Sequence, residues 1–389
     1  MTGARRRALA SWPRLFFYTF LLVLLRPEDP LPYLFFLPGI FFSSAFRGET
    51  RPLYLWLGWS FFSALWAPGF PASLATWGEE CLVGGAGFAA GLYGRQDRRW
   101  LLAMEIAGFL IGGLALVQAA VAPPFPRGWV APAERGVLPF RVTGLWSNPN
   151  RTGLFLAFLL PLFLVRVEEG KERTRRANTG AQPAGGGLRP VPPARAAFFM
   201  VLTGLTATAL LFTYARTAWV AAVVALFLYW GPREWVNRRR LVAFILVLIG
   251  FFPSVAGRIG RNPFASGTMN YRLAVWQETW QLVQKYPLTG GGEKELRAAL
   301  RPWRVDHAHN HYLQIAAEKG VPAFLLYGWL LFRFWQAARR PGSTAAGRAR
   351  GDDRLRRGVV AAFGGQVFAG LTESIWAVPL GSFLFWFAF

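Results

Sequence analysis

The stretch Asp306-His307-Ala308-His309-Asn310-His311-Tyr312 ends a long polar segment and runs directly into an apolar one, Leu313 to Trp335. The apolar segment is long enough to cross a bilayer as one helix. The chain has three histidines in 389 residues, and all three lie in this stretch. A cluster of titratable side chains at the edge of a membrane span indicates a site for acid–base chemistry.

Apolar segments of this kind recur along the whole chain, of which 53% is hydrophobic. Most are about 15 to 23 residues long, the length that a membrane-spanning helix needs. We therefore predict an all-α fold, a polytopic transmembrane helical bundle of about 12 spans. The spans are expected near 11–25, 31–46, 53–67, 73–93, 100–122, 152–166, 196–213, 216–230, 241–256, 313–337, 358–376 and 377–389.

The arginines of the connecting segments predict the orientation. Cytoplasmic loops of membrane proteins are enriched in Lys and Arg. An N-terminus in the cytoplasm makes every predicted inner segment basic, and the even span count returns the C-terminus to the same side. These inner segments are 1–10, 47–52, 94–99, 167–195, 231–240 and 338–357. No small-residue cleavage site follows the first apolar run, so we expect an uncleaved span rather than a signal peptide.

The expected organisation has four parts. Residues 1–150 form an N-terminal transmembrane bundle. Residues 151–256 form central transmembrane helices, interrupted at 167–195 by a Gly-, Pro- and Arg-rich segment that predicts a disordered cytoplasmic loop. Residues 257–312 form a long extracytoplasmic loop with short amphipathic helices, and residues 313–389 form the C-terminal transmembrane helices.

Charge and cysteine content exclude two classes of function. The net charge of +23 lies in short loops between apolar runs, so no nucleic-acid partner is expected. A single cysteine, Cys81, excludes an internal disulfide and a cysteine-based metal site.

Two arginines stand at positions suited to binding an anion. A helix is predicted from Asn270 to about Tyr286, with Leu273, Trp276, Trp280 and Val283 at helical spacing, and Arg272 would lie in its first turn, where an anion is favoured. Arg216 lies between two spans with almost no connecting loop. It either extends to the lipid headgroups or faces an anion site inside the bundle.

The histidines allow three interpretations. The first is a metal site formed by His307, His309 and His311, with Asp306 as a further ligand. The second is a polar cap without chemistry. The third is a general base, one histidine positioned by Asn310 or Asp306. Carboxylates in or near the spans often mark ion paths, which keeps a transporter in consideration. They are Glu79, Glu80, Glu105 and Glu373.

Five motifs together resemble those of the O-antigen ligase and polymerase superfamily of membrane glycosyltransferases. His309-Asn310 is followed after nine residues by Gly320. The other four motifs are Trp146-Ser147-Asn148-Pro149-Asn150-Arg151-Thr152-Gly153, Tyr214-Ala215-Arg216-Thr217-Ala218-Trp219, Tyr271-Arg272-Leu273-Ala274-Val275-Trp276 and Tyr286-Pro287-Leu288-Thr289-Gly290. Their order, spacing and placement on one membrane face carry the resemblance.

The resemblance implies transfer of a glycan from a polyprenyl-diphosphate carrier to an acceptor hydroxyl, an inverting reaction without metal or other cofactor. His309 would be the general base, and Arg216 and Arg272 would bind the diphosphate. The residues expected to contact substrate are Asn148, Asn150, Arg151, Tyr271, Trp276, Asn310 and Tyr312.

The expected partners are the lipid-linked glycan donor, a lipid, glycan or protein acceptor, and membrane lipids. The expected location is the bacterial cytoplasmic membrane, with the active site on its outer face. A polysaccharide polymerase of the same superfamily and an inorganic-carbon or other solute transporter are the alternatives. A non-catalytic scaffold explains neither the histidine cluster nor Arg216.

Overall fold

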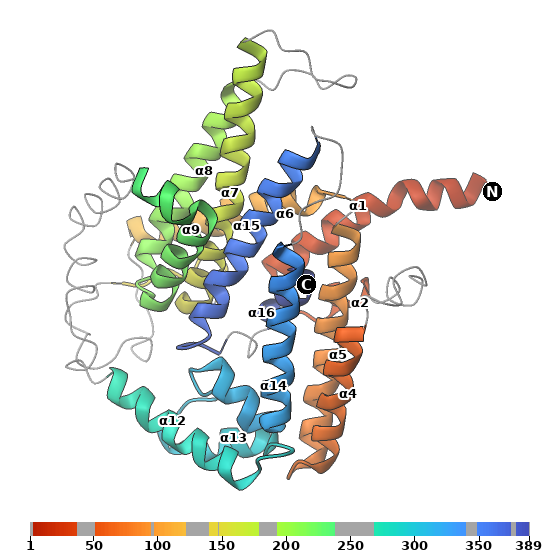
Figure 1. Cartoon of the computed structure of the whole chain (residues 1–389), viewed down its shortest axis with the longest axis vertical. Coiled ribbons are helices and arrows are strands. Elements are labelled where there is room, and N and C mark those ends of the chain that lie inside the picture. Colours follow the sequence, from red (N-terminus) through yellow and green to blue (C-terminus); the bar gives the residue numbers. More distant parts are fainter. Residues whose placement is uncertain are drawn as a thin grey trace. The chain divides into compact units, whose positions relative to one another are not determined.

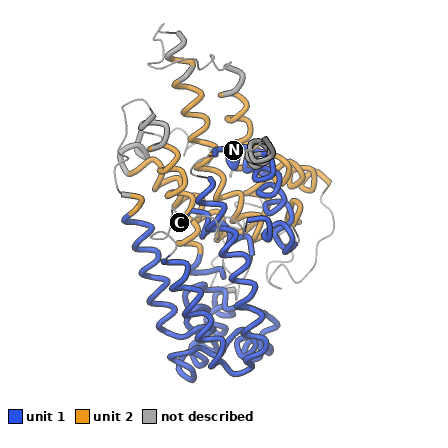
Figure 2. The backbone as a smooth tube through the Cα atoms, turned by 90° about the vertical axis from the view of Figure 1, so that its right-hand side faces the viewer, with its two compact units in different colours: residues 1–107, 268–336, 370–389 blue, residues 108–267, 337–369 orange. Residues whose placement is uncertain are grey.

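The computed structural model describes residues 3–36, 51–94, 97–121, 140–146, 148–178, 193–237, 268–339, 348–374 and 379–388. Every regular element in these ranges is a helix (Figure 1). The all-helical fold class is therefore confirmed for the described residues. The chain forms two compact units that each combine segments far apart in the sequence (Figure 2). The four-part division in chain order stays a prediction.

Unit 1 comprises residues 1–107, 268–336 and 370–389. Its N-terminal helices are α1 (Gly3–Leu25), α2 (Leu31–Leu34), α4 (Arg51–Trp66) and α5 (Phe70–Gly94). Its later elements are α12 (Thr268–Lys285), α13 (Gly292–Leu300), the short 3-10 helix η4 (Arg301–Trp303), most of α14 (His311–Arg339) and α16 (Pro379–Ala388).

Helices α5 and α16 approach each other closely because α5 carries two glycines four residues apart. A Cβ atom at Gly87 would lie 2.4 Å from the Phe383 carbonyl oxygen, and one at Gly91 would lie 2.4 Å from that of Phe387. Residues four apart share one helix face, and small residues there let two backbones meet. Phe383 also packs its ring against Phe20.

Replacing Gly87 by alanine tests this contact. We expect Gly87→Ala to lower the free energy of unfolding by about 1–3 kcal/mol, because the added methyl group meets backbone that cannot move aside. Gly78→Ala on the same helix is the matched control, since a Cβ there has nothing within 4 Å. Thermal unfolding in detergent would measure both; an equal melting temperature for the two variants contradicts the packing.

The elements from α12 to α14 share a small hydrophobic core. Helix α12 faces it with Val275, Leu282 and Val283, and the remaining buried members are Leu296, Leu300, Ala316 and Ala317. The helix predicted at 270–286, with an apolar face suited to the membrane surface, is confirmed as a helix. Leu273 and Trp280 are exposed, so they lie on the outer side of α12. Membrane-surface contact through these two side chains stays a prediction.

Gly320 permits a sharp break in α14. Its φ is 84°, in the left-handed region that favours glycine, and a Cβ there would lie 2.0 Å from the Leu288 carbonyl oxygen. The next residue, Val321, donates its N–H to the Pro287 carbonyl at 2.8 Å. The break therefore joins the loop after α12 to α14, which explains why the motif that begins at His309 ends in a glycine.

A buried ion pair joins α5 and α14. The Lys319 Nζ lies 2.9 Å from Glu80 Oε1, and both side chains are largely shielded from solvent. A buried charge must be paired to be tolerated. Glu80, one of the four carboxylates that kept a transporter in consideration, thus has a basic partner.

Unit 2 comprises residues 108–267 and 337–369. It contains the later part of α6 (Arg99–Val121), α7 (Pro149–Asn178), α8 (Pro193–Phe212), α9 (Arg216–Asn237) and α15 (Arg348–Ala369). Helix α7 packs against α8, α9 and α15. One core cluster consists of Val165, Tyr229, Trp230 and Ala361.

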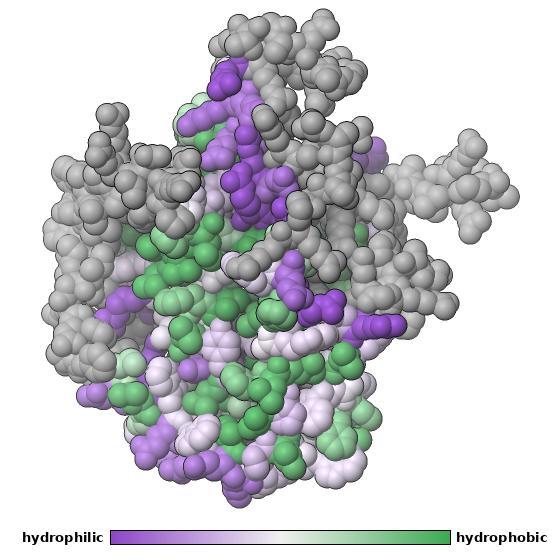
Figure 3. All heavy atoms as spheres, viewed as in Figure 1, coloured by the Kyte–Doolittle hydropathy of each residue, from purple (hydrophilic) through white to green (hydrophobic). Residues whose placement is uncertain are grey.

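Two boundaries in unit 2 differ from prediction. Helix α7 continues to Asn178, so the first part of the segment 167–195 that we predicted to be disordered is helical. Helix α15 begins at Arg348 and ends at Ala369, whereas the predicted span was 358–376. Polar contacts support both extensions: Arg354 forms an ion pair with Glu172, and the Tyr229 hydroxyl donates a hydrogen bond to Glu168 at 3.0 Å. Figure 3 shows hydrophilic side chains over the C-terminal part of α7.

Two of the described helices are long and apolar enough to cross a membrane, Arg99–Val121 and His311–Ala338. Four shorter apolar helices are Arg14–Leu25, Ala196–Phe212, Arg216–Gly231 and Pro379–Ala388. Helix α14 exposes Leu325, Phe332 and Trp335, and Figure 3 shows hydrophobic side chains gathered over it, as lipid contact requires. The count of about 12 spans stays a prediction: the span expected at 241–256 and most of that at 31–46 lie outside the described residues.

Candidate active site

The histidine loop connects η4 to α14 and is held at both ends. Asn310 caps α14, because its Oδ1 accepts a hydrogen bond from the Leu313 N–H at 3.0 Å. The His311 N–H donates to the Gly370 carbonyl at 2.7 Å, which ties the loop to the turn after α15. The buried Ala308 donates its N–H to Gln314 Oε1 at 3.3 Å. The loop therefore presents its histidines from a fixed backbone.

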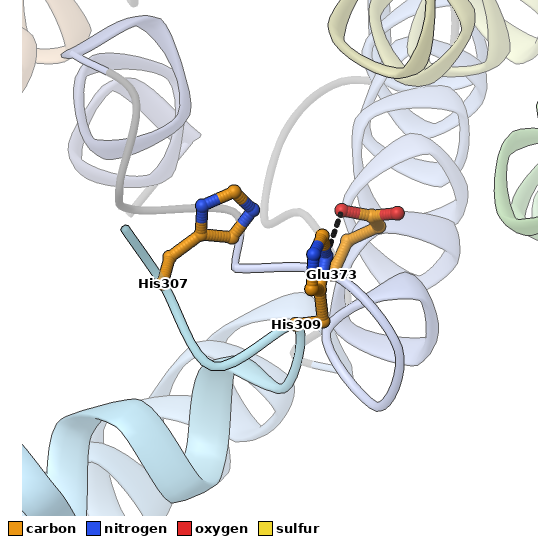
Figure 4. Close-up of side chains that lie close together, drawn as sticks. All are labelled: His307, His309 and Glu373. Carbon is orange, nitrogen blue, oxygen red and sulfur yellow. Dashed lines mark ion pairs between the residues drawn. The ribbon is translucent and has the colours of Figure 1, made fainter. Parts of the chain in front are cut away.

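His309 faces a buried carboxylate. Its Nδ1 lies 3.6 Å from Oε2 of Glu373, which belongs to the turn after α15 (Figure 4). This separation fits an ion pair and is too long for a hydrogen bond. His309 has a φ of 50°, in the left-handed region that costs about 1–3 kcal/mol outside glycine. Such strain gathers at functional sites, and here it turns the imidazole toward Glu373.

Arg272 shares the same carboxylate. Its Nη2 lies 3.1 Å from Glu373 Oε1, so the two oxygens of Glu373 face one basic side chain each. Burial tends to raise the pKa of the Glu373 carboxyl, but His309 and the Arg272 guanidinium outweigh burial and hold that pKa well below its usual range. Glu373 therefore remains ionised and can position both side chains.

The predicted place of Arg272 in the first turn of its helix is wrong. Helix α12 begins at Thr268, which makes Arg272 its fifth residue. The free N–H groups of the helix end lie before it. Arg272 is instead held by Glu373.

The three histidines do not act as one group. The His307 ring lies against that of His309, tilted by 56°, with ring centroids 4.3 Å apart. His311 is buried and packs its ring against Tyr327 at 5.1 Å. The metal site that used all three histidines is therefore wrong in its ligand set. Glu373 takes the place of His311: one ligand atom each from His307, His309 and Glu373 lies within 4.8 Å of the others.

Three aromatic candidates surround this loop. The Tyr271 ring lies 6.5 Å from that of His309, and the Tyr271 hydroxyl donates to the Trp303 carbonyl at 2.9 Å. Trp276 packs against the core of α12 to α14. Tyr312 packs against both His311 and Tyr327. Tyr271 is thus the aromatic candidate beside His309, and the substrate contacts of all three stay predictions.

The remaining candidates lie in unit 2, around the start of α7. Asn148 caps α7 by accepting the Asn150 N–H at 2.8 Å and the Arg151 N–H at 3.4 Å. The Asn150 Oδ1 accepts a hydrogen bond from the buried Arg141 at 2.7 Å. Arg141 also donates to the Thr213 carbonyl at 2.9 Å. These contacts join the motif at 146–153 to the turn before Arg216.

Arg216 is the first residue of α9, and three residues separate it from the end of α8 at Phe212. The predicted near-absence of a loop between these helices is confirmed. Tyr214, two residues before Arg216, is buried and has a φ of 51°. This strained, buried turn therefore fixes the position of Arg216 at the start of α9.

Sequence reasoning missed the two residues that organise these groups, Glu373 and Arg141. In the sequence, Glu373 stands out only as a carboxylate in an apolar segment. Such a carboxylate needs a basic partner, but the chain offers many arginines and the partner is 101 residues away. Arg141 had no signal in its local sequence.

The apolar helices indicate a helical membrane protein. The Glu373 carboxylate, shared by the His309 imidazole and the Arg272 guanidinium, makes a candidate site for acid–base chemistry and anion binding. Residues 199–328 match the family model for O-antigen ligase, and this match supports membership of the O-antigen ligase superfamily. The predicted resemblance is thereby confirmed. The matched segment contains Arg216, Arg272 and His309. No curated protein sequence matches the chain.

The family match supports a membrane glycosyltransferase-like activity in general, on polysaccharide substrates. It also implies lipid-linked glycan donors and glycan acceptors in general terms.

Proposed function

We propose that the protein transfers a glycan from a polyprenyl-diphosphate carrier to an acceptor hydroxyl at the outer face of the bacterial cytoplasmic membrane, as an O-antigen ligase does. The observation that carries this proposal is the convergence of His309 and Arg272 on Glu373. A base and an anion-binding group are thereby held in one site. Arg216 enters the proposal through the family motif.

The proposed reaction is a displacement at the anomeric carbon of the donor sugar. His309 accepts the proton of the acceptor hydroxyl while the hydroxyl oxygen attacks that carbon. The bond from the anomeric carbon to the diphosphate oxygen breaks, and the polyprenyl diphosphate leaves with the electron pair. Inversion at the anomeric carbon follows from attack opposite the leaving group.

Each side chain has a defined part in that reaction. Glu373 faces Nδ1 of His309, which leaves Nε2 for the acceptor, and its negative charge stabilises the imidazolium that forms. Arg272 and Arg216 neutralise the charge that develops on the diphosphate, since a planar guanidinium binds two phosphate oxygens at once. Guanidinium groups can thereby take the place of a metal ion.

Transfer in proteoliposomes tests the proposal. The purified protein would receive a polyprenyl-diphosphate oligosaccharide and a panel of lipid, glycan and protein acceptors. One block added to a foreign acceptor identifies a ligase, whereas a ladder of repeats identifies a polymerase. Absence of any product, together with solute flux in the same vesicles, would replace the transferase by a transporter.

Removal of metal tests the proposed chemistry separately. We expect EDTA to lower the rate of transfer by no more than about twofold, because arginines stabilise the leaving group. The rate would be measured before and after dialysis against the chelator. A loss that added zinc restores would show that the reaction requires a metal.

A further inference from the structure

We propose that His307, His309 and Glu373 form a binding site for a divalent transition-metal ion, best matched by Zn²⁺, and that the bound ion inhibits glycan transfer. The inhibition rests on the proposed function, whereas the binding does not. The three side chains come from two segments, the loop before α14 and the turn after α15 (Figure 4). Two imidazoles and one carboxylate are ligands that zinc prefers.

The distance between His309 and Glu373 supports a shared ion. The Nδ1 of His309 is buried and has no hydrogen-bond partner among the described residues. It lies 3.6 Å from Glu373 Oε2. Zinc bonds of about 2.0–2.2 Å in a tetrahedral site place two ligand atoms roughly 3.3–3.6 Å apart. The distance between His309 Nδ1 and Glu373 Oε2 is too long for a hydrogen bond, but it matches the distance expected between two ligand atoms of one zinc ion.

The third ligand and the outer contacts fit the same site. The His307 ring lies 4.3 Å from the His309 ring, close enough for one of its nitrogens to join the group. Arg272 holds Oε1 of Glu373 at 3.1 Å, which orients the carboxylate and directs Oε2 to the histidines. Such outer hydrogen bonds fix the ligands of many metal sites. Three protein ligands leave the fourth position of the ion to water.

Inhibition follows from the chemistry of the imidazole ring. A neutral imidazole carries hydrogen on one nitrogen and a lone pair on the other. If Nδ1 of His309 gives its lone pair to the ion, Nε2 keeps its hydrogen. It then cannot accept the proton of the acceptor hydroxyl. Zinc therefore competes with the proposed base function of His309, and the metal-free protein is the active form.

Titration of ZnCl₂ into the purified full-length protein, prepared without a polyhistidine tag, tests the binding. We expect one ion per chain, and at least about tenfold weaker binding in His307→Ala and Glu373→Gln. Asp306→Asn is the matched control, because Asp306 neighbours His307 but is exposed and lies outside the ligand group. Equal zinc affinity in wild type and His307→Ala would overturn the site.

The inhibition is tested in the transfer assay with and without zinc. Zinc should lower the rate of the wild type, whereas the rate of His307→Ala should be the same with and without zinc. Equal zinc inhibition of both would overturn the inhibitory role even if the ion binds. Undiminished transfer by His309→Ala would instead overturn the proposed base, and the zinc titration would still decide the metal site.

Discussion

Replacing His309 by alanine is expected to lower the rate of glycan transfer by roughly 10²–10⁴-fold, the contribution of a positioned general base. The loss should appear in kcat, because proton removal takes place in the transition state rather than in substrate binding. Initial rates over a range of acceptor concentrations would separate kcat from KM. The physical reason is the placement of the imidazole against Glu373 at 3.6 Å.

Two comparisons guard this result against a folding defect. His309 has a φ of 50°, and alanine is less favourable there than histidine. His309→Asn tolerates the left-handed backbone but cannot serve as a base, so it should be as inactive as His309→Ala. Melting temperatures close to wild type would show that both variants fold. Wild-type turnover in a folded His309→Asn variant would remove His309 as the base.

Replacing Arg272 by lysine is expected to lower transfer by roughly 10²–10³-fold, the usual cost of losing one group that stabilises developing charge. A lysine can keep an ion pair with Glu373, so the fold should survive. Its ammonium cannot bind two phosphate oxygens in the planar manner of a guanidinium. The rate with saturating donor measures this effect, and Arg216→Lys should behave alike.

Arg297→Lys provides a matched control for Arg272→Lys. Arg297 lies on α13, is mostly exposed and pairs with Glu293 on the same helix. The substitution is chemically identical, but its site has no proposed part in the reaction, so transfer should be unchanged. An equal loss in both variants would show a general effect of the substitution and would contradict the diphosphate role.

The sequence predicts most helices because their apolar runs are long and bounded by Pro, Gly or charge. The runs at 53–67, 73–93 and 100–122 agree with α4, α5 and α6. The missed extensions of α7 and α15 are polar and become helical where charges pair between helices, as Arg354 does with Glu172. A pattern of hydrophobicity along one segment cannot detect such pairs.

For the candidate site, local motifs predict His309 and Arg272 but not what holds them. Their common partner, Glu373, lies two helices beyond the histidine loop, after α14 and α15, and comes close only through the fold. The spacing of the histidines suggested one ligand group of three, yet His311 turns into the buried contact with Tyr327. The helix that starts at His311 decides this, because it ends the alternation of an extended chain.

The most direct test of the central claim is the stoichiometry of one reaction in proteoliposomes. Purified wild type and His309→Asn would each receive a labelled polyprenyl-diphosphate oligosaccharide and an acceptor that the wild type uses. We predict that the wild type releases one polyprenyl diphosphate for each glycan transferred, with the anomeric configuration inverted, and that His309→Asn releases none. Release at equal rates by both proteins, or loss of donor without a glycosylated acceptor, would contradict the account.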